Sequence, residues 1–384
     1  MKASSTSVLH LVSWYPSKVH PSLGNFVAEH VLAIQAKVPG AVLGAFAADA
    51  NSIDYQIENG VPVCRVYFIK KLPFTSYLKA LRKGYEELLS RGFHFDLAHL
   101  HVAYPAGLFL LNLKLPYIIT EHFSAYQKNR RKDLSLANRL VAKLIFNKAH
   151  FVTPVSDQLG LSLKDFGVKS PQITIGNVVN TNIFQYKTKV ESLSFRVLHI
   201  SSLQESTKNI SGIVSAFADF HQKFPLSSLS IGGDGQADEL LMHIKDCQIP
   251  KEAYRILPAL SKEEVAQEMQ ESDCFLLFSH IENQPVVILE SLCIGRPVIA
   301  TRVGGIAQLL DKSRGLLIEA NNRDQLIEAL SEMYHSHQNY GHKKMASIAQ
   351  NEFGYEAIAE KFSEVYSNVL RLNASGQKDL NLEP

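Results

Sequence analysis

The sequence predicts an α/β protein with two doubly wound, parallel-sheet domains. The chain has 384 residues, which is too long for one ordinary core and suits two or three domains of ~150 residues each. Short apolar runs alternate with helical patterns along the chain, as they do in βα units. A polar segment without clear periodicity, residues 184–194, separates two such series and reads as a linker.

Each predicted element is an apolar run or an amphipathic period bounded by turn residues. In the first series we expect strands at 8–12, 41–48, 63–67, 97–100, 117–120, 151–155 and 173–175, and helices at 25–37, 76–90, 134–148 and 156–166. In the second we expect strands at 196–200, 228–231, 254–256, 274–278, 297–301 and 315–318, and helices at 210–220, 237–244, 262–271, 285–294, 323–335 and 354–372.

These elements place an N-terminal domain at 1–188 and a second domain at 195–353. A C-terminal helix with a frayed tail follows at 354–384. Ligands of such sheets lie at the carboxyl ends of the strands, so we expect a binding cleft between the domains.

The composition excludes several classes of protein. Apolar residues make up 46% and charged residues 20%, which is ordinary for a globular protein and excludes disordered, collagen-like and coiled-coil chains. No run of 18 apolar residues predicts a membrane span, and the N-terminus lacks a signal-peptide apolar region. The four cysteines show no CxxC spacing, so we expect reduced thiols and a cytoplasmic protein.

Charge divides the chain into two halves. Residues 1–190 hold 22 Lys and Arg against 11 Asp and Glu, and the remainder holds 17 against 26. Two basic segments, 70–83 and 128–132, would suit an anionic membrane on whose inner face the protein is peripheral. A solvated helix face and loop explain the same charges equally well. Nucleic acid is disfavoured, because no nucleic-acid-binding motif accompanies the charge.

The most informative stretch is 279–301. A strand ends at Ser279, a helix begins near Pro285, and Glu282 and Glu290 are eight residues apart, ~12 Å if helical. Between them lie backbone N–H groups at the positive end of a helix, which bind phosphate. Carboxylates suit diols, so Glu282 would take sugar hydroxyls and Glu290 a ribose. The alternative is a capping Glu followed by a solvent-facing one.

Motifs for other chemistries are absent from the sequence. No Asp-x-Asp pair, HExxH or CxxC occurs, so we expect no metal and no cofactor. Walker A, GxGxxG and GxSxG patterns are also missing. The run Gly232-Gly-Asp-Gly235 follows a strand and predicts a tight turn near the ligand.

Together these segments resemble glycosyltransferase family 4, whose members have the GT-B fold of two Rossmann-like domains and retain anomeric configuration. The resemblance follows the chain in order through 10–16, 24–26, 97–101, 120–122, 153–156, 175–178, 231–235, 279–301 and 303–305. The segment with the two Glu residues is its specific part, because the glycine pairs are weak alone.

The resemblance implies roles for individual residues on the donor side. Lys208 would clamp the diphosphate, whose negative charge grows as the nucleotide leaves. Glu282 would hold the donor sugar. Further donor contacts are implied at Gly24, Ser202, Asn283, Gln284, Pro285, Val286 and Glu290.

The chain departs from the family pattern at one position. Many members carry an Arg six residues before the clamping Lys, where this chain has Ser202. Only Lys208 is then a certain cation at the diphosphate. Another group, for which Arg302 is a candidate, would replace the missing cation, or catalysis is weaker.

On the acceptor side the resemblance points to three residues. His122, in the segment Thr120-Glu-His122, matches the family's active-site histidine. His101 and Glu121 are expected near the acceptor. His99 and His101 are predicted to point to opposite faces at the end of their strand.

The resemblance implies a metal-independent retaining glycosyltransferase. It would move a sugar from a UDP-, GDP- or ADP-sugar to a hydroxyl of a glycan or lipid-linked acceptor, in surface polysaccharide, lipopolysaccharide or glycolipid synthesis. Two alternatives stay open: a nucleotide-sugar epimerase or phosphorylase of the same fold, and an inert sugar-nucleotide-binding protein.

Overall fold

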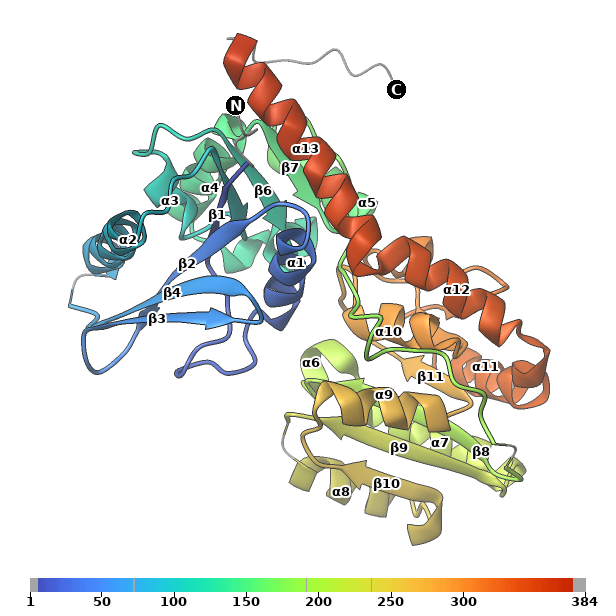
Figure 1. The fold of residues 1–384 in the computed structure, drawn as a ribbon. Helices are drawn as coiled ribbons and strands as arrows, with labels where there is room; N and C mark the ends of the chain where they lie inside the picture. Colours follow the sequence, from blue (N-terminus) through green and yellow to red (C-terminus); the bar gives the residue numbers. More distant parts are fainter. Residues whose placement is uncertain (1–5, 72, 191, 236, 376–384) are drawn as a thin grey trace. The chain divides into compact units, whose positions relative to one another are not determined.

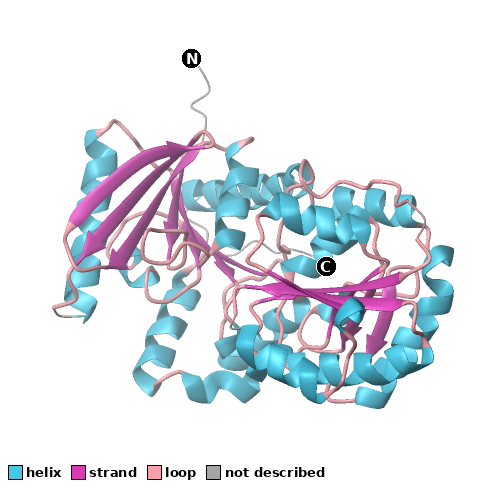
Figure 2. Cartoon of the chain, turned by 90° about the horizontal axis from the view of Figure 1, so that it is seen from below, coloured by secondary structure: helices cyan, strands magenta, loops and turns pink. Residues whose placement is uncertain are grey.

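The computed structural model describes residues 6–71, 73–190, 192–235 and 237–375. The chain divides into two compact units (Figure 1). The first unit comprises Met1–Val178 with Tyr355–Pro384, and the second comprises Val179–Gly354. Both are α/β units in which helices flank a central sheet (Figure 2).

The first unit is built on a seven-stranded sheet of order β3-β4-β2-β1-β5-β6-β7. Its strands are β1 (Val8–Val12), β2 (Gly40–Ala47), β3 (Ser52–Glu58), β4 (Val61–Phe68), β5 (Leu97–His101), β6 (Tyr117–Glu121) and β7 (Phe151–Pro154). All pairings are parallel except that of β3 with β4. β3 was not predicted, because this edge strand is mostly exposed and lacks an apolar run. The strand expected at 173–175 is wrong: only an isolated bridge joins Val152 to Gln172 there.

Helices of the first unit bury apolar faces against this sheet. They are α1 (Asn25–Gln35), α2 (Pro73–Ser90), α3 (Gly107–Leu110), α4 (Leu136–Lys148), α5 (Asp157–Phe166) and α13 (Tyr355–Ser375), with 3₁₀ turns at Ser124–Tyr126 and Lys128–Asp133. Ser135 and Ser156 cap α4 and α5 by accepting backbone N–H bonds. The C-terminal helix α13 belongs to this unit, because Phe362 and Tyr366 join a buried cluster with Ile34 of α1.

The second unit holds a six-stranded, fully parallel sheet of order β10-β9-β8-β11-β12-β13. Its strands are β8 (Phe195–Ser201), β9 (Ser227–Gly233), β10 (Tyr254–Leu257), β11 (Cys274–Leu277), β12 (Val298–Thr301) and β13 (Gly315–Ile318). The central strands β11 and β12 are buried along their whole length. Burial on both faces explains their continuous apolar runs.

The helices of the second unit begin at recognisable caps. They are α6 (Glu205–Lys208), α7 (Ile210–Lys223), α8 (Ala237–Asp246), α9 (Lys262–Glu271), α10 (Val286–Ile294), α11 (Arg323–Ser336) and α12 (His342–Phe353), with 3₁₀ turns at Lys251–Ala253, Ile306–Gln308 and His337–Asn339. A capping box of Ser261 and Glu264 starts α9. α12 was not predicted, although Met345, Ala346, Ala349 and Phe353 form a buried apolar stripe along it.

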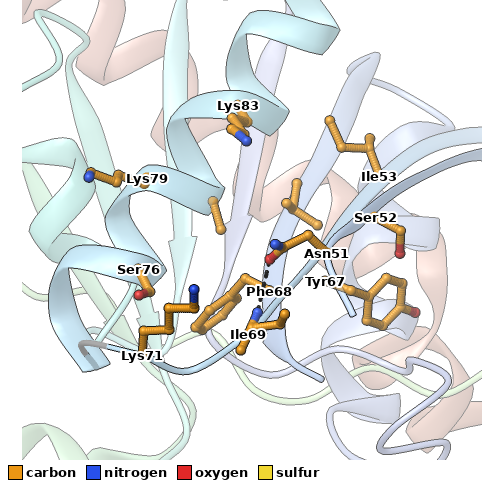
Figure 3. A pocket seen from close by; sticks show the side chains of 12 residues that line it. Asn51, Ser52, Ile53, Tyr67, Phe68, Ile69, Lys71, Ser76, Lys79 and Lys83 are labelled. Atoms are coloured by element: carbon orange, nitrogen blue, oxygen red, sulfur yellow. Dashed lines mark hydrogen bonds between the residues drawn. The ribbon is translucent and has the colours of Figure 1, made fainter. Parts of the chain in front are cut away.

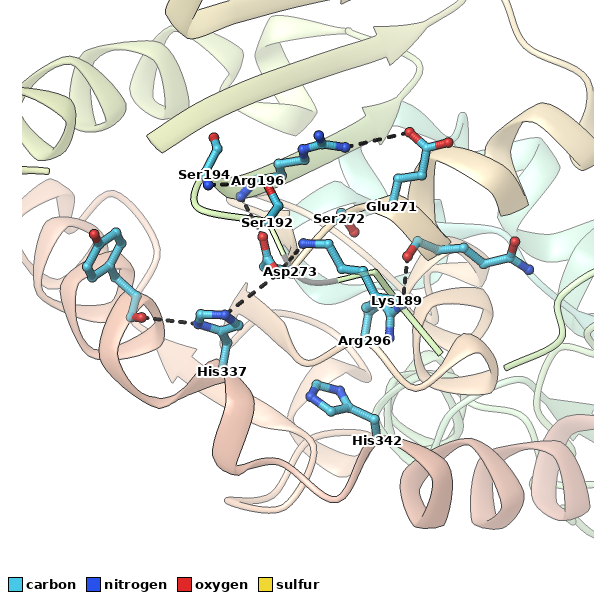
Figure 4. A network of polar contacts seen from close by, with 12 residues as sticks. Lys189, Ser192, Ser194, Arg196, Glu271, Ser272, Asp273, Arg296, His337 and His342 are labelled. Carbon is cyan, nitrogen blue, oxygen red and sulfur yellow. Dashed lines mark hydrogen bonds and ion pairs between the residues drawn. The ribbon is translucent and has the colours of Figure 1, made fainter. Parts of the chain in front are cut away.

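A buried carboxylate ties the first residues of the second unit to its sheet (Figure 4). Asp273 pairs with Lys189, lies 3.6 Å from Nε2 of His337, and accepts a hydrogen bond of 2.8 Å from the backbone N–H of Arg196. Arg296 adds a bond of 2.6 Å to the carbonyl of Gln270. The segment called a linker in the sequence is thus fixed to the second unit.

The structure offers no candidate for a membrane-crossing helix. Within the described residues, every helix is too short or too polar to span a bilayer. The four cysteines are free thiols, three of them buried.

His199 in β8 is buried and uses both ring nitrogens. Nδ1 lies 2.8 Å from the carbonyl oxygen of Leu276, and Nε2 lies 2.8 Å from Oγ of Ser201. Burial lowers the pKa of His199 to about 4, and the charge of Lys208 also contributes. The imidazole is therefore neutral in the folded protein near neutral pH.

This neutral histidine should make stability fall with acid. In the unfolded chain a histidine takes up a proton near pH 6.5, whereas the folded protein keeps His199 neutral until about pH 4. The contribution of neutral His199 to the free energy of unfolding is therefore fully present above pH 6.5 and is lost as the pH falls toward 4. The loss should reach about 3 kcal/mol. Because His199→Gln removes this titration, the gap in unfolding free energy between wild type and variant should shrink by that amount from pH 7 to pH 4. A gap that does not change with pH, measured by urea denaturation, would contradict the assignment.

Candidate functional site

Lys208 stands at the carboxyl end of β8, on the short helix α6. The next residue, Asn209, has a left-handed backbone (φ 52) and caps α7 by accepting the N–H of Gly212. This turn ends α6 directly after Lys208. The side chain of Lys208 is 18% exposed.

The Lys208 ammonium pairs with Glu282. Nζ lies 2.5 Å from Oε1 of Glu282, whose side chain is only 9% exposed. The same oxygen accepts a hydrogen bond of 2.8 Å from Oγ of Ser279. Two of the residues predicted for the donor site, 74 positions apart in the sequence, are therefore in direct contact.

Neighbouring loops fix the segment that carries Glu282. A Cβ at Gly304 would lie 1.9 Å from the carbonyl oxygen of Glu282, so only glycine allows this approach. The next N–H, of Gly305, donates to the carbonyl of Asn283 at 2.6 Å. On the other side, the N–H of His280 donates to the carbonyl of Thr207 at 2.8 Å, beside Lys208. These contacts set the distance between the two charges.

Helix α10 follows this loop with its N-terminus free of acidic side chains. Pro285 is its N-cap residue, in an extended conformation, so the first N–H groups of the helix have no side-chain cap. Such an end attracts anions. Glu290 lies in the second turn. Because the helix begins only at Val286, the ~12 Å helical spacing expected between the two glutamates does not apply.

The glycine turn after β9 packs on the loop that contains Ser202. A Cβ at Gly233 would lie 1.9 Å from the carbonyl oxygen of Ser201, and one at Gly235 would lie 2.9 Å from that of Ser202. Ser202 itself is exposed. Arg302, the candidate replacement cation, forms an ion pair of 3.2 Å with Glu319 at the surface, so its guanidinium already has an acidic partner.

The first unit gathers five histidines at the carboxyl ends of its central strands. His10 lies in β1, His30 in α1, His99 and His101 in β5, and His122 directly after β6; the first four are fully buried and His122 is 9% exposed. The prediction that His99 and His101 point to opposite faces is wrong. Their rings stack with centroids 3.9 Å apart, because residues two apart in a strand share a face.

Hydrogen bonds hold most of these rings. His99 contacts the hydroxyl of Tyr366 and Oγ1 of Thr120, both at 2.6 Å. Nδ1 of His10 lies 3.2 Å from Nε2 of His101, and Nε2 of His30 lies 3.0 Å from the carbonyl of Gly176. The first contact needs a proton on one nitrogen and a lone pair on the other, and the second needs a proton on Nε2 of His30.

Burial keeps this cluster uncharged. It lowers the pKa of His10 to about 3 and of His30 to about 4, and neighbouring histidines add to the effect at His10. The pKa values of His99, His101 and His122 are also well below the ordinary value, again mainly through burial. The positive charge of the first half of the sequence therefore lies outside this cluster.

Glu121 is fully buried and holds the backbone around His122. Its carboxylate accepts N–H bonds from Ala103 (3.0 Å), His122 (2.9 Å) and Phe123 (2.8 Å). Burial raises its pKa to about 7, although these hydrogen bonds oppose the rise. The geometry gives Glu121 a structural task, and its expected place beside an acceptor stays a prediction.

His122 lies between Phe26 of α1 and Asn177, which follows α5 in the chain. Its ring centroid is 4.6 Å from that of Phe26, and its side chain hydrogen-bonds that of Asn177. Gly24 has a left-handed backbone (φ 80), and a Cβ there would meet the backbone of Trp14 at 2.6 Å. Gly24 thus lets the loop before α1 fold tightly next to Phe26.

Two contributors were not predicted from the sequence. His30 was read only as part of a helix, although its spacing from Phe26 places both on one helical face. Asn177 was noted in a motif without a role. The predicted roles of all site residues stay predictions.

Comparisons with known proteins match both halves of the chain. The family described as Glycosyltransferase Family 4 matches residues 42–183, and the one described as Glycosyl transferases group 1 matches residues 194–336. The putative teichuronic acid biosynthesis glycosyltransferase TuaC of Bacillus subtilis is 26% identical over 300 residues, which cover 73% of each chain. The N-acetyl-alpha-D-glucosaminyl L-malate synthase of Bacillus anthracis is 29% identical over 186 residues, about half (47%) of either chain.

Solved structures share the fold. Sucrose-phosphate synthase from Thermosynechococcus elongatus superposes with a TM-score of 0.77 at 16% identity, covering 95% of this chain and 99% of that one. Anabaena Alr3699/HepE in complex with UDP gives a TM-score of 0.72 at 16% identity, with 94% and 100% coverage. Together with the matches to both halves, these likenesses show that the chain belongs to glycosyltransferase family 4 and has the GT-B fold.

Proposed function

We propose that this glycosyltransferase is a retaining, metal-independent enzyme that moves a sugar from a nucleotide-sugar donor to a hydroxyl acceptor. The second unit would bind the donor and the first unit the acceptor, a glycan or a lipid-linked sugar. The product would serve surface polysaccharide, lipopolysaccharide or glycolipid synthesis at the cytoplasmic face of a membrane.

The contact between Lys208 and Glu282 carries this proposal. The two charges face each other at 2.5 Å, and Glu282 is almost closed from solvent. A sugar nucleotide offers a partner to each of them. Its diphosphate can pair with the Lys208 ammonium, and its sugar hydroxyls can donate hydrogen bonds to the Glu282 carboxylate. Neither charge is then left without a partner on binding.

Lys208 would act mainly in the transition state. Negative charge grows on the diphosphate as it leaves, and a fixed ammonium beside it lowers the barrier. The uncapped N–H groups at the start of α10 would add to this stabilisation. The leaving phosphate would then help to deprotonate the acceptor hydroxyl on the same face of the sugar, which retains its configuration.

The names of similar proteins narrow the first substrates to test. One structural neighbour, Anabaena Alr3699/HepE, is described both in complex with UDP and in complex with UDP-glucose. TuaC is named for teichuronic acid biosynthesis, and other relatives are D-inositol 3-phosphate glycosyltransferases. UDP-sugars are therefore the first donors to test, and acidic glycans or sugar phosphates are the first acceptors.

An inert binding protein remains the second candidate because of Ser202. The position holds no cation, and Arg302 pairs with Glu319. An epimerase or phosphorylase of the same fold is the third, and it would act without a glycan acceptor.

A donor panel separates these candidates. Purified protein incubated with UDP-, GDP- and ADP-sugars should release one nucleoside diphosphate slowly, and faster when the acceptor is present. Glu282→Gln should abolish this release, because the neutral amide no longer binds Lys208 or hydroxyls as a carboxylate does. Binding without release would favour the inert protein, and phosphate-dependent turnover or sugar epimerisation without an acceptor would favour the third candidate.

Lys208→Ala should reduce kcat by about 10²–10³-fold, as removal of a transition-state donor does elsewhere. The variant also leaves the enclosed Glu282 carboxylate without its partner, so some loss of stability is expected, and circular dichroism should confirm that the variant is folded before kcat is compared. Lys223→Ala, at an exposed position of α7, is the matched control and should keep full activity. If Lys208→Ala turns over donor at the wild-type rate, Lys208 is not at the diphosphate.

We also propose that α2 contacts an anionic membrane. Lys71, Lys79 and Lys83 surround a pocket of about 410 Å³ between α2 and strands β3 and β4 (Figure 3). Within the described residues these lysines form no ion pair. In the second basic segment, by contrast, Arg130 pairs with Asp133 and Arg131 with Asp165. Arg82 of α2 pairs with Glu86, so Lys79 and Lys83 are the α2 charges that we propose to contact lipid headgroups.

Vesicle binding tests this contact. Binding should require anionic phosphatidylglycerol and should weaken with salt, because surface charges are screened. A lysine near an anionic membrane contributes ~1 kcal/mol, so the double variant Lys79→Gln/Lys83→Gln should bind roughly 30-fold more weakly. Lys114→Gln, an exposed lysine outside α2, should bind nearly as wild type does. Equal binding to neutral phosphatidylcholine vesicles would contradict the proposal.

A further inference from the structure

The first unit contains more buried histidines than the proposed reaction uses. Within the described residues, two sets of three bring one ring nitrogen each within 4.8 Å of the others: His10, His99 and His101, and His30, His101 and His122. Three imidazoles are a common protein ligand set for zinc. The two sets share His101, so the question is whether an ion would be held by His101 with His10 and His99, or by His101 with His30 and His122.

Ring geometry excludes the first set. A ligand nitrogen lies ~2.1 Å from the metal in the plane of its ring, so three rings arranged tetrahedrally have centres ~5 Å apart. His99 and His101 are stacked with centroids at 3.9 Å, and stacked rings cannot both point at one ion. Both nitrogens of His99 are also occupied, by Tyr366 and Thr120 at 2.6 Å.

The second set comes closer to the spacing that a metal requires. The ring centroids of His30 and His122 are 5.3 Å apart, and those of His30 and His101 are 6.3 Å apart. The ligand atoms of this set lie within 4.8 Å of one another. Around a tetrahedral ion the nitrogens are ~3.4 Å apart, so each ring must move by less than ~1 Å to bind it.

Two of the three rings offer an unused nitrogen. Nδ1 of His30 and Nδ1 of His101 are buried and have no hydrogen-bond partner among the residues that the structure describes. Nε2 of His30 donates to the carbonyl of Gly176 at 3.0 Å, which leaves a lone pair on Nδ1. Buried polar atoms without partners are rare and call for an explanation.

The surroundings of the rings resemble the outer shell of a metal site. A ligating histidine usually donates its other N–H to a carbonyl or carboxylate, which fixes the ring and its tautomer. The Gly176 carbonyl does this for His30, and the Asn177 side chain hydrogen-bonds His122. His101 uses Nε2 toward His10 at 3.2 Å, which leaves Nδ1 for the ion.

We infer that His30, His101 and His122 form a binding site for a late first-row transition metal ion such as Zn²⁺. Imidazole nitrogen suits this class of ion, and the burial of the site favours a three-coordinate protein set with one further position. The ion would join α1, β5 and the end of β6. His122 is also the ring that the family resemblance places at the active site, but the inference rests on the geometry of the three rings and stands whether or not the proposed transfer holds.

Metal binding to the full-length wild-type protein tests the site directly. After removal of metal with a chelator, Co²⁺ should bind with one-to-one stoichiometry and give the visible absorption of a tetrahedral nitrogen site. X-ray absorption of the Zn²⁺ complex should show light scatterers at ~2.0–2.1 Å. Bound Zn²⁺ should also raise the thermal midpoint of unfolding. Sulfur scattering, which would point to the cysteines, or no saturable binding, would overturn the inference.

Variants identify the ligands. His30→Gln and His122→Gln should each weaken Zn²⁺ binding by at least the roughly 10–100-fold that loss of an outer-shell partner costs. His99→Gln, from the excluded set, should bind Zn²⁺ as wild type does, and so should His199→Gln, a buried histidine of the second unit. Circular dichroism checks that each variant folds. Wild-type affinity in both His30→Gln and His122→Gln, or its loss in His99→Gln, would overturn the assignment.

Discussion

The ion pair between Lys208 and Glu282 is the interaction on which the candidate site of the second unit depends. Neither charge could remain in so enclosed a place alone, because an unpaired charge out of water is costly. The pair exists because glycine at 304 lets one loop touch the backbone of Glu282, while the Thr207 carbonyl holds the other loop. A ligand that supplies both an anion and hydroxyls can replace each partner without exposing the other.

Much of the fold could be predicted from the sequence, because burial leaves a periodic trace. The strands Val8–Val12 and Gly315–Ile318 and the helix Lys262–Glu271 have the predicted bounds. The first of these strands is buried throughout, and the helix starts at a capping box, so each has a strong local signal. β3 was missed because it is mostly exposed and its apolar pattern is weak. α12 was missed although it buries Met345, Ala346, Ala349 and Phe353 at helical spacing.

The site was only partly predictable, for a topological reason. β8 and β11 are neighbours in the sheet, so their carboxyl ends bring Lys208 and Glu282 together, as a parallel sheet requires. The family resemblance selected Lys208, whereas Glu282 was selected by its place beside a predicted helix N-terminus and its spacing from Glu290. Predicting the histidine cluster would have required knowing which face of α1 packs against the sheet. His30 reaches it from α1 and Asn177 from a loop, and neither placement is written in local sequence.

The two units bury polar groups at equivalent edges of their sheets by different means. The second unit uses fixed opposite charges, which suit a ligand that is itself charged. The first unit uses neutral imidazoles, whose protons can be shared between rings at 3.2 Å. A neutral ring offers one donor and one acceptor, so it can position a hydroxyl or coordinate an ion without a charge to desolvate. The excess of positive charge in the first half of the sequence therefore lies outside its histidine cluster, whereas the second unit carries a pair of opposite charges in its candidate site.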